Sequence, residues 1–172
     1  MSRYKIGFVG SQGSGKTTLA YELATELKKS GKDVYVLSEV ARSSPLPLNE
    51  DATKETQFWI FGKQMTREQS SKGEVLITDR TLLDPLVYGI RVCKEYFLCL
   101  KPFVKEYMKT YDVIVYLPPN DNYLVDDGIR STNKGFRNEI DEMTIALLQE
   151  LEVDYIIGGK GLGLKVLDLI KN

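Results

Sequence analysis

The sequence predicts an α/β fold, in which a parallel sheet of five strands is packed between helices in three layers. Two observations lead to this prediction. Five short apolar runs alternate with segments whose apolar residues recur at helical spacing, and this alternation is typical of a parallel sheet with helical crossovers. The 172 residues contain no internal repeat, low-complexity tract or linker, so we expect a single domain over residues 1–172.

The five predicted strands are short and almost continuously apolar, as expected for strands buried on both faces of a sheet. Ligands of such sheets bind beyond the carboxyl ends of the strands, so the residues that follow each strand are the first candidates for a functional site. We place the strands at residues 5–9, 34–37, 75–78, 113–117 and 155–157.

The predicted helices lie between these strands. Leu19, Leu23 and Leu27 recur every fourth residue, which indicates one buried helix face. Gly31 is expected to end this helix. A second helix is expected to start near Asn49 or Asp51, and Phe58, Phe61 and Met65 lie on it. Two more follow at 83–100 and 103–108, separated by Pro102, and the last two cover 139–151 and 162–170.

The composition narrows the chemistry that the chain can perform. It contains no histidine, which excludes a Ser-His-Asp triad and every histidine-ligated metal site. A net charge of −1 and a pI near 5.7 argue against stable binding to nucleic acid, which usually requires a basic surface. No apolar run reaches the roughly 20 residues that cross a bilayer, and Cys93 and Cys99 favour free thiols over a disulfide. We therefore expect a cytoplasmic protein without membrane contact, and a homodimer stays open.

The segment after the first predicted strand carries the strongest motif. Residues 10–18 read Gly-Ser-Gln-Gly-Ser-Gly-Lys-Thr-Thr and match G-x-x-x-x-G-K-[ST] in full, between a strand and an amphipathic helix. Glycines let the backbone turn its N–H groups inward around an anion, and the start of the helix adds its positive dipole end. A glycine-rich connecting turn is the alternative, which the complete motif in its full context disfavours. The motif predicts a P-loop NTPase fold and a nucleotide site formed by Gly10, Gly13, Ser14, Gly15, Lys16, Thr17 and Thr18.

Two side chains of this motif have a direct chemical role. Lys16 is expected to place a positive charge on the terminal phosphates of ATP, and Thr17 to offer its hydroxyl to Mg²⁺. Asp79, at the end of the third predicted strand, is placed to hold the same ion through water or, alternatively, to cap the following helix. Arg80 beside it is placed to reach a phosphate group. The sequence therefore predicts ATP and Mg²⁺ as cofactors, with Thr17 and Asp79 at the metal.

A second carboxylate follows the second predicted strand. Glu39 would lie beside the phosphate loop if this strand neighbours the third, and Arg42 would then hold the acceptor. Because histidine is absent, Glu39 and Asp79 are both candidates for a general base that acts on an acceptor hydroxyl. An exposed salt bridge between Glu39 and Arg42 is the alternative. Asp84 and Tyr88, one and two turns further along the chain, are expected to face the same cleft, with a helix cap before Pro85 as the equal alternative for Asp84.

The polar segment at about 120–138 predicts a short lid. It contains two glycines together with Arg130, Lys134 and Arg137, and phosphoryl transfer needs positive charge on the transferring group and exclusion of water. A charged, solvated helix start is the alternative. Near the C-terminus, the glycines at 158–161 follow the last strand, where they could pass over the adenine base or form a simple turn.

With these residues, the sequence resembles nicotinamide-riboside kinase domains and, more broadly, the AAA-type P-loop kinases related to deoxynucleoside and thymidylate kinases. The resemblance spans nearly the whole chain, and Asp-Gly-Ile-Arg at 127–130 is its most specific part. It implies that Arg130 and Arg137 are lid arginines that close on ATP. Asp79-Arg80 is similar to the Asp-Arg pair of thymidylate kinases. Nicotinamide-riboside kinase domains lack an arginine at the Arg80 position, so Arg80 favours an acceptor that carries a phosphate.

The leading hypothesis is an ATP-dependent phosphotransferase that acts on a nucleoside or nucleoside monophosphate. Aromatic residues of the second helix are expected to be mainly core, but Trp59 is offset from the stripe of Phe58 and Phe61 and is the best pocket candidate. The predicted catalytic residues are Lys16, Glu39, Asp79, Arg80, Arg130 and Arg137, and the predicted acceptor-binding residues are Arg42, Trp59 and Tyr88.

Two other functions remain open at this stage. The acceptor could be a hydroxyl of a nucleic acid, such as a 5′ end or a modified base, although the acidic pI argues against a basic binding groove. The chain could also be a regulatory P-loop NTPase, which the absence of an Asn-Lys-x-Asp segment for guanine disfavours.

Overall fold

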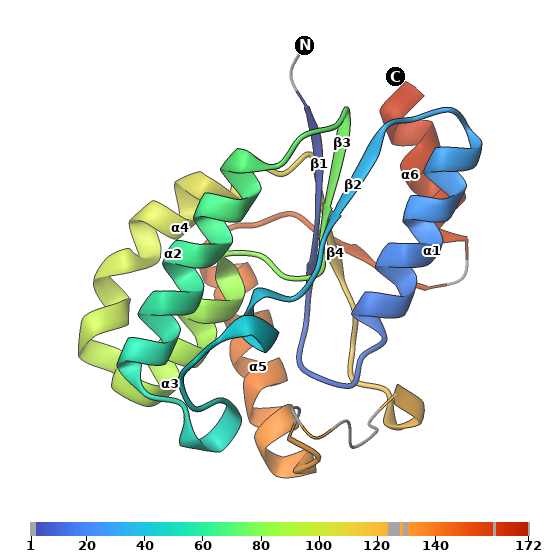
Figure 1. Cartoon of the computed structure of the whole chain (residues 1–172). Coiled ribbons are helices and arrows are strands. Elements are labelled where there is room, and N and C mark those ends of the chain that lie inside the picture. Colours follow the sequence, from blue (N-terminus) through green and yellow to red (C-terminus); the bar gives the residue numbers. More distant parts are fainter. Residues whose placement is uncertain (1–2, 124–127, 129–130, 160, 172) are drawn as a thin grey trace.

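The computed structural model of the chain describes residues 3–123, 128, 131–159 and 161–171. Five strands form one sheet in the order β2-β3-β1-β4-β5, and every neighbouring pair is parallel. The predicted parallel sheet of five strands is therefore confirmed (Figure 1). The strands are β1 (Tyr4–Val9), β2 (Val34–Leu37), β3 (Val75–Thr78), β4 (Val113–Tyr116) and β5 (Ile156–Ile157).

Helices cover both faces of this sheet, so the predicted three layers are also confirmed. Figure 1 shows α1 and α6 on one face and α2, α3, α4 and α5 on the other. On the first face, α1 (Lys16–Lys29) contacts α6 (Leu162–Lys171). On the second face, α3 packs against each of its three neighbours. That layer consists of α2 (Lys54–Ser70), α3 (Leu83–Phe97), α4 (Lys101–Met108) and α5 (Lys134–Glu150).

Side-chain caps explain why two helices begin where they do. The α2 helix starts at Lys54 and not near Asn49, because Thr53 and Thr56 form a capping box that satisfies the first N–H groups. Residues Asn49–Asp51 form a separate 3₁₀ turn. The α5 helix starts before residue 139, because the side chain of Asn133 accepts a hydrogen bond from the backbone N–H of Phe136.

The segment between the two predicted helices at 83–100 and 103–108 is more helical than expected. Pro102 lies in the first turn of α4, where its missing N–H costs no hydrogen bond. The interruption lies earlier, at Cys93, whose backbone leaves the helical region (φ −154°, ψ 79°). The prediction that Pro102 breaks the helix is therefore wrong in position, since proline is tolerated at a helix start.

The sheet separates two apolar cores. One lies between the sheet and α1 with α6, around Phe8, Leu23 and Val115. The other lies under α3 and α5, around Leu86, Phe97 and Ile140. All four residues of β3 and of β4 are buried, which explains why these strands are continuous apolar runs in the sequence.

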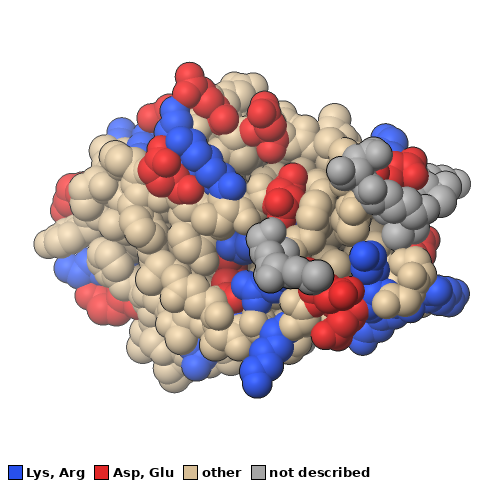
Figure 2. Space-filling model, turned by 90° about the horizontal axis from the view of Figure 1, so that it is seen from above, with Lys and Arg blue, Asp and Glu red and all other residues tan. Residues whose placement is uncertain are grey.

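The molecular surface carries charges of both signs. Figure 2 shows the face at the amino ends of the strands, where acidic and basic side chains are interspersed among the described residues without a broad basic area. Within the described part of the chain, no helix is both long and apolar enough to cross a membrane.

Candidate active site

The phosphate loop (residues 10–18) consists of the connection between β1 and α1 and the first residues of α1, and it lies at the carboxyl end of the central strand. Gly10 has φ 136°, and a Cβ atom there would lie 2.4 Å from the carbonyl oxygen of Leu117. Gly13 (φ 65°) and Gly15 (φ 85°) adopt left-handed conformations. Because only glycine reaches these φ values without strain, the sequence motif corresponds to a backbone requirement at each of the three positions.

The start of α1 is open for an anion. Gly15 is the N-cap residue, and it has no side chain to accept a hydrogen bond from the first turn. The N–H groups of that turn therefore point toward the loop together with the positive end of the helix dipole. This arrangement is an anion site of the kind that binds phosphate groups.

Lys16 supplies the positive charge inside this loop. Its side chain is 5% exposed, and its Nζ donates hydrogen bonds to the carbonyl of Ser11 and, at 2.9 Å, to Oγ of Ser14. Burial, reinforced by the nearby Arg80 guanidinium, lowers the pKa of Lys16 to about 7, although neighbouring carboxylates oppose the change. A group that has lost its hydration in this way gains strongly from an incoming phosphate.

Thr17 and Asp79 lie next to each other beside Lys16. The Thr17 hydroxyl donates a 2.6 Å hydrogen bond to Oδ2 of Asp79, so Asp79 faces the phosphate loop and not the start of the next helix. Burial raises the pKa of the Asp79 carboxyl, and the Thr17 hydrogen bond opposes this rise. A hydroxyl and a carboxylate next to a phosphate site fit the oxygen ligands that Mg²⁺ prefers. Among the described residues, no group of three or more His, Cys, Asp or Glu side chains is arranged to hold a metal ion.

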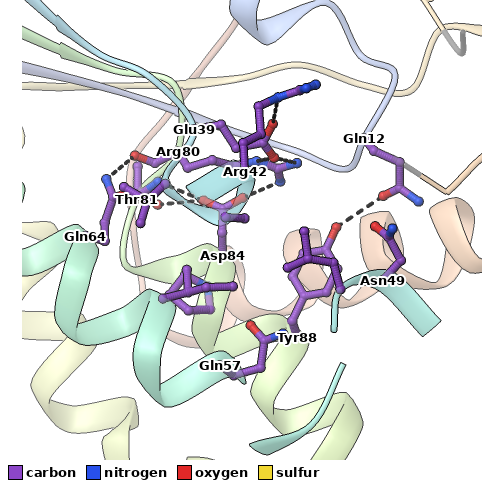
Figure 3. Close-up of a pocket in the computed structure, with 15 residues that line it drawn as sticks. Gln12, Glu39, Arg42, Asn49, Gln57, Gln64, Arg80, Thr81, Asp84 and Tyr88 are labelled. Carbon is purple, nitrogen blue, oxygen red and sulfur yellow. Dashed lines mark hydrogen bonds and ion pairs between the residues drawn. The ribbon is translucent and has the colours of Figure 1, made fainter. Parts of the chain in front are cut away.

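A second cavity opens beyond the carboxyl ends of β2 and β3, and we call it the β2–β3 pocket (Figure 3). Because β2 pairs directly with β3, Glu39 lies beside the phosphate loop, as the sequence prediction required. The walls come from the phosphate loop, the segment after β2, α2 and α3. The lining residues are Gln12, Glu39, Val40, Ala41, Arg42, Leu48, Asn49, Gln57, Ile60, Gln64, Arg80, Thr81, Asp84, Pro85 and Tyr88.

Arg80 is held between two carboxylates at the base of this pocket (Figure 3). Its guanidinium lies 3.0 Å from Oε1 of Glu39 and 2.8 Å from Oδ1 of Asp84. It also donates to the carbonyl oxygen of Gly10 at 3.0 Å. Burial by itself would lower the pKa of Arg80, but the two carboxylates outweigh it and raise the pKa well above its ordinary value. Arg80 is therefore permanently charged, and its charge is compensated by protein groups.

Glu39 bridges two arginines. Oε2 accepts a 3.1 Å hydrogen bond from Nε of Arg42, while Oε1 binds Arg80. The Glu39–Arg42 pair that the sequence left open as a surface contact is thus present, but the Glu39 side chain is only 9% exposed. The structure brings Glu39, Arg42 and Arg80 together in one network and places Asp79 separately, hydrogen-bonded to Thr17.

Tyr88 connects the β2–β3 pocket to the phosphate loop. Its hydroxyl donates a 3.2 Å hydrogen bond to Oε1 of Gln12. Burial raises the pKa of Tyr88 to about 12, and the neighbouring Arg80 opposes this rise. The hydroxyl therefore stays protonated as a donor across the physiological pH range.

The structure does not bring Trp59 into this pocket. Trp59 is partly buried against Leu37, Val40 and Leu76, and Phe58 is 42% exposed and stacks on Phe97. The face of α2 that lines the pocket carries Gln57, Ile60 and Gln64, at the i, i+3, i+7 spacing of a single helix face. Sequence reasoning missed these residues because it searched α2 for aromatic side chains, although the spacing itself is visible in the sequence.

Gln64, one of these three missed residues, supports Arg80. Its Nε2 donates to the backbone carbonyl of Arg80 at 2.9 Å and to Oε1 of Glu68 at 2.7 Å. Glu68 is fully buried and also pairs with Lys5 at 2.6 Å. This network ties α2 to the end of β3 behind the pocket.

The start of α5 approaches the phosphate loop from the other side. Asp141 accepts hydrogen bonds from Ser11 at 3.4 Å and from Tyr116 at 2.9 Å. One turn earlier, the 5% exposed Arg137 pairs with Asp121 at 2.8 Å. Nε and NH1 of Arg137 are buried and have no hydrogen-bond partner within the described residues. Arg130 lies outside the described residues.

The predicted lid segment contains two kinds of structure where it is described. Asp121–Tyr123 form a 3₁₀ turn, and the ring of Tyr123 lies 3.0 Å from the Cβ position at Gly15. From Lys134 onward the segment belongs to α5. A second cleft runs along α1 and is lined by Thr18, Glu22, Pro118 and the glycines at 158, 159 and 161, so the C-terminal glycines border the space next to the phosphate loop.

Comparisons with known proteins agree with this geometry. A protein-family model described as an AAA domain matches residues 5–162. No curated protein sequence matches the chain significantly.

Solved structures extend the comparison. The fold is similar to that of a deoxyadenosine kinase from M. mycoides with the products dCMP and dCDP bound (TM-score 0.65, 15% identity, 97% of this chain and 98% of that chain). It is also similar to a NadR protein in complex with NR (TM-score 0.72, 22% identity, 98% of this chain and 51% of that chain). The chain thus spans about half the length of NadR, and at these identities the likeness is one of fold.

Proposed function

The chain belongs to the AAA domain family, and from this premise we propose that it is a kinase that transfers the γ-phosphate of ATP to the hydroxyl of a nucleoside. One observation carries the proposal. A hydrogen-bonded hydroxyl and carboxylate, Thr17 and Asp79, and a separate carboxylate, Glu39, lie on two sides of one phosphate loop. This is the arrangement needed to hold a nucleotide phosphate on one side and an acceptor on the other.

The phosphate loop binds and orients the donor. The backbone N–H groups of the loop and of the first turn of α1 hold the phosphate oxygens, and Lys16 contributes its charge where negative charge develops during transfer. Thr17 and Asp79 would hold magnesium, which would supply further positive charge to the phosphate groups. Arg137, with two buried donor atoms unpartnered in the described residues, contributes to the same charge stabilisation, as does Arg130.

Glu39 acts on the acceptor hydroxyl. Asp79 is hydrogen-bonded to Thr17, with which it would hold the metal, whereas Glu39 lines the β2–β3 pocket. Arg80 and Arg42 fix the Glu39 carboxylate. A carboxylate held in this way orients the hydroxyl for attack and accepts its proton as the bond to phosphorus forms.

The charge balance of the pocket favours a nucleoside over a nucleoside monophosphate. Arg80 is bound by the carboxylates of Glu39 and Asp84, and Arg42 is bound by Glu39. The two positive and two negative charges therefore cancel. A monophosphate would have to displace a carboxylate from a buried arginine, which is costly. A nucleoside needs only apolar surface and hydrogen bonds, which Ile60, Pro85 and the amide of Gln57 offer.

The structural relatives support the same class of acceptor. The similar kinase from M. mycoides is a deoxyadenosine kinase, and the NadR relatives bind NR in one structure and NAD with AMP-PNP in another.

The test is a measurement of product formation with ATP and magnesium across nucleosides, nicotinamide riboside, nucleoside monophosphates and a short DNA duplex. We expect phosphorylation of at least one nucleoside and at least tenfold slower turnover of its monophosphate. Glu39→Gln should lower kcat for the nucleoside by about 10²–10⁴-fold. Glu106→Gln, at an exposed carboxylate paired with Lys109, is the matched control and should leave kcat unchanged. ATP hydrolysis without any acceptor, or phosphorylation of the duplex alone, would overturn the proposal.

A further inference from the structure

Gln12 differs from the other side chains of the phosphate loop in the direction it faces. Residues 13–18 line the cradle at the start of α1, whereas Gln12 lines the β2–β3 pocket. Its side chain is 3% exposed, so it is part of the inner wall at the junction of the two sites (Figure 3). Gln12 is thus the residue of the loop best placed to contact an acceptor.

The amide of Gln12 is oriented by Tyr88. The Tyr88 hydroxyl donates its hydrogen to Oε1 of Gln12 at 3.2 Å. Burial raises the pKa of Tyr88, so its hydroxyl keeps the hydrogen that it donates to the amide oxygen. An amide oxygen can only accept, so the Tyr88–Gln12 hydrogen bond assigns the other end of the amide, Nε2, as the donor.

The donor end of this amide lacks a hydrogen-bond acceptor among the described residues. Nε2 of Gln12 is buried and has no hydrogen-bond partner within the described residues. Buried polar side-chain atoms are nearly always paired, because an unpaired donor loses its hydration without compensation. The amide nitrogen can only donate, so the missing partner is an acceptor atom such as an oxygen.

We infer that Gln12 forms a polar subsite that binds a sugar hydroxyl oxygen of the acceptor. This inference rests on the proposed function. The acceptor's reacting hydroxyl must approach the phosphate held by the loop, so the acceptor atoms nearest to a loop residue are those of the sugar that carries this hydroxyl. Gln12 then selects acceptors with a second hydroxyl on that sugar, and Tyr88 is the positioning residue that presents the amide.

The test compares acceptors that differ by one hydroxyl. The best nucleoside from the panel above is measured beside its 2′-deoxy, 3′-deoxy and 2′,3′-dideoxy analogues. For the analogue that lacks the bound hydroxyl, we expect kcat/KM to be about 10- to 100-fold lower, because the analogue leaves Nε2 unpaired. In Gln12→Met, which keeps the length of the side chain but has no donor, this discrimination should fall to about threefold or less, while KM for ATP stays within about twofold. Tyr88→Phe should reduce the discrimination partly.

The same kinetic measurements separate failure of this inference from failure of the proposed function. If the chain phosphorylates a nucleoside but Gln12→Met keeps the discrimination of the unmodified protein, the inference is wrong and the proposed function stands. A rise in KM for ATP without change in discrimination would also overturn it, because Gln12 would then contact the donor. Thermal unfolding of Gln12→Met and of Gln12→Glu, which keeps the shape but has no N–H donor, verifies that each variant is folded.

Discussion

The phosphate loop and the β2–β3 pocket are adjacent, yet they are built in opposite ways. The loop consists of consecutive residues whose backbone does most of the binding, and three glycines with positive φ enforce its shape. The pocket collects side chains from the loop, the segment after β2, α2, the end of β3 and α3. The loop is therefore defined by local backbone geometry, whereas the pocket depends on how distant elements pack.

The two regions also treat positive charge differently. Within the part of the chain that the structure describes, Lys16 in the loop hydrogen-bonds only neutral atoms of Ser11 and Ser14, whereas Arg80 in the pocket is bound by two carboxylates. The positive charge of the loop therefore suits an anion, whereas the compensated charges of the pocket suit a neutral molecule. An arginine near a site does not by itself predict a phosphate ligand, because neighbouring carboxylates can already compensate its charge.

Loss of the loop charge should have the largest effect on activity. Lys16→Met should lower kcat/KM by about 10²–10³-fold, because a buried charge at the transferring phosphate is removed. Steady-state kinetics with the best acceptor measures this effect. Lys109→Met, at an exposed lysine, is the control and should be silent. Near-normal activity of Lys16→Met would show that the loop does not act on the transferring group.

Backbone substitution in the loop should cost stability. A methyl group at Gly10 would meet the Leu117 carbonyl at 2.4 Å, at a φ value that only glycine adopts readily. We expect Gly10→Ala to lower the free energy of unfolding by about 2–4 kcal/mol, as measured from urea unfolding.

The matched control for Gly10 is Gly62, on the exposed side of α2. A Cβ atom at Gly62 meets nothing within 4 Å, so Gly62→Ala should raise the free energy of unfolding by about 0.5–1 kcal/mol through helix propensity. Equal losses of stability in both variants would remove the distinction between a constrained loop glycine and a tolerant glycine on an exposed helix surface.

The pH dependence of nucleotide binding should report on Lys16. Its pKa in the free protein is about 7, and bound phosphate favours the charged form, so binding above pH 7 must take up a proton. The Kd for ATP should therefore rise by up to about tenfold for each pH unit above 7. Calorimetry in buffers of different ionisation enthalpy measures the uptake, and Lys16→Met separates it from titration of the nucleotide.

The same pKa has the opposite effect on the stability of the free protein. Between pH 7 and the ordinary lysine value of 10.5, the unfolded chain binds more protons at this site than the folded chain does. The contribution of Lys16 to the free energy of unfolding therefore increases as the pH rises through this window. For the binding prediction, a Kd for ATP that is constant from pH 7 to pH 9 would contradict a pKa of about 7 for Lys16.

The smallest effect should come from Trp59. Because Trp59 packs against Leu37, Val40 and Leu76 and not along the pocket, Trp59→Phe should change KM for the acceptor by less than about threefold. The free energy of unfolding should fall by about 1 kcal/mol through the lost packing. Acceptor titrations and urea unfolding measure the two quantities. A large rise in KM with unchanged stability would restore Trp59 as an acceptor-binding residue.

The sequence by itself determined the sheet, the helices and the phosphate loop. Continuous apolar runs predicted strands such as β3 and β4, since burial on both faces leaves no polar positions. The loop was readable because consecutive residues with special backbone geometry leave a local signature in glycine, lysine and threonine. Helix starts were less accurate, because the caps at Thr53 and Asn133 are single side-chain contacts outside the apolar pattern.

Only the tertiary structure decided the partners within the pocket. The pairing of β2 with β3 brought Glu39 to Arg80, the rotation of α2 turned Gln57 inward and Trp59 away, and the approach of α3 oriented Gln12 through Tyr88. Each of these contacts joins residues that are far apart in the sequence. Their chemistry depends on strand order and helix rotation, which arise from packing of the whole chain and leave no local signature at either residue.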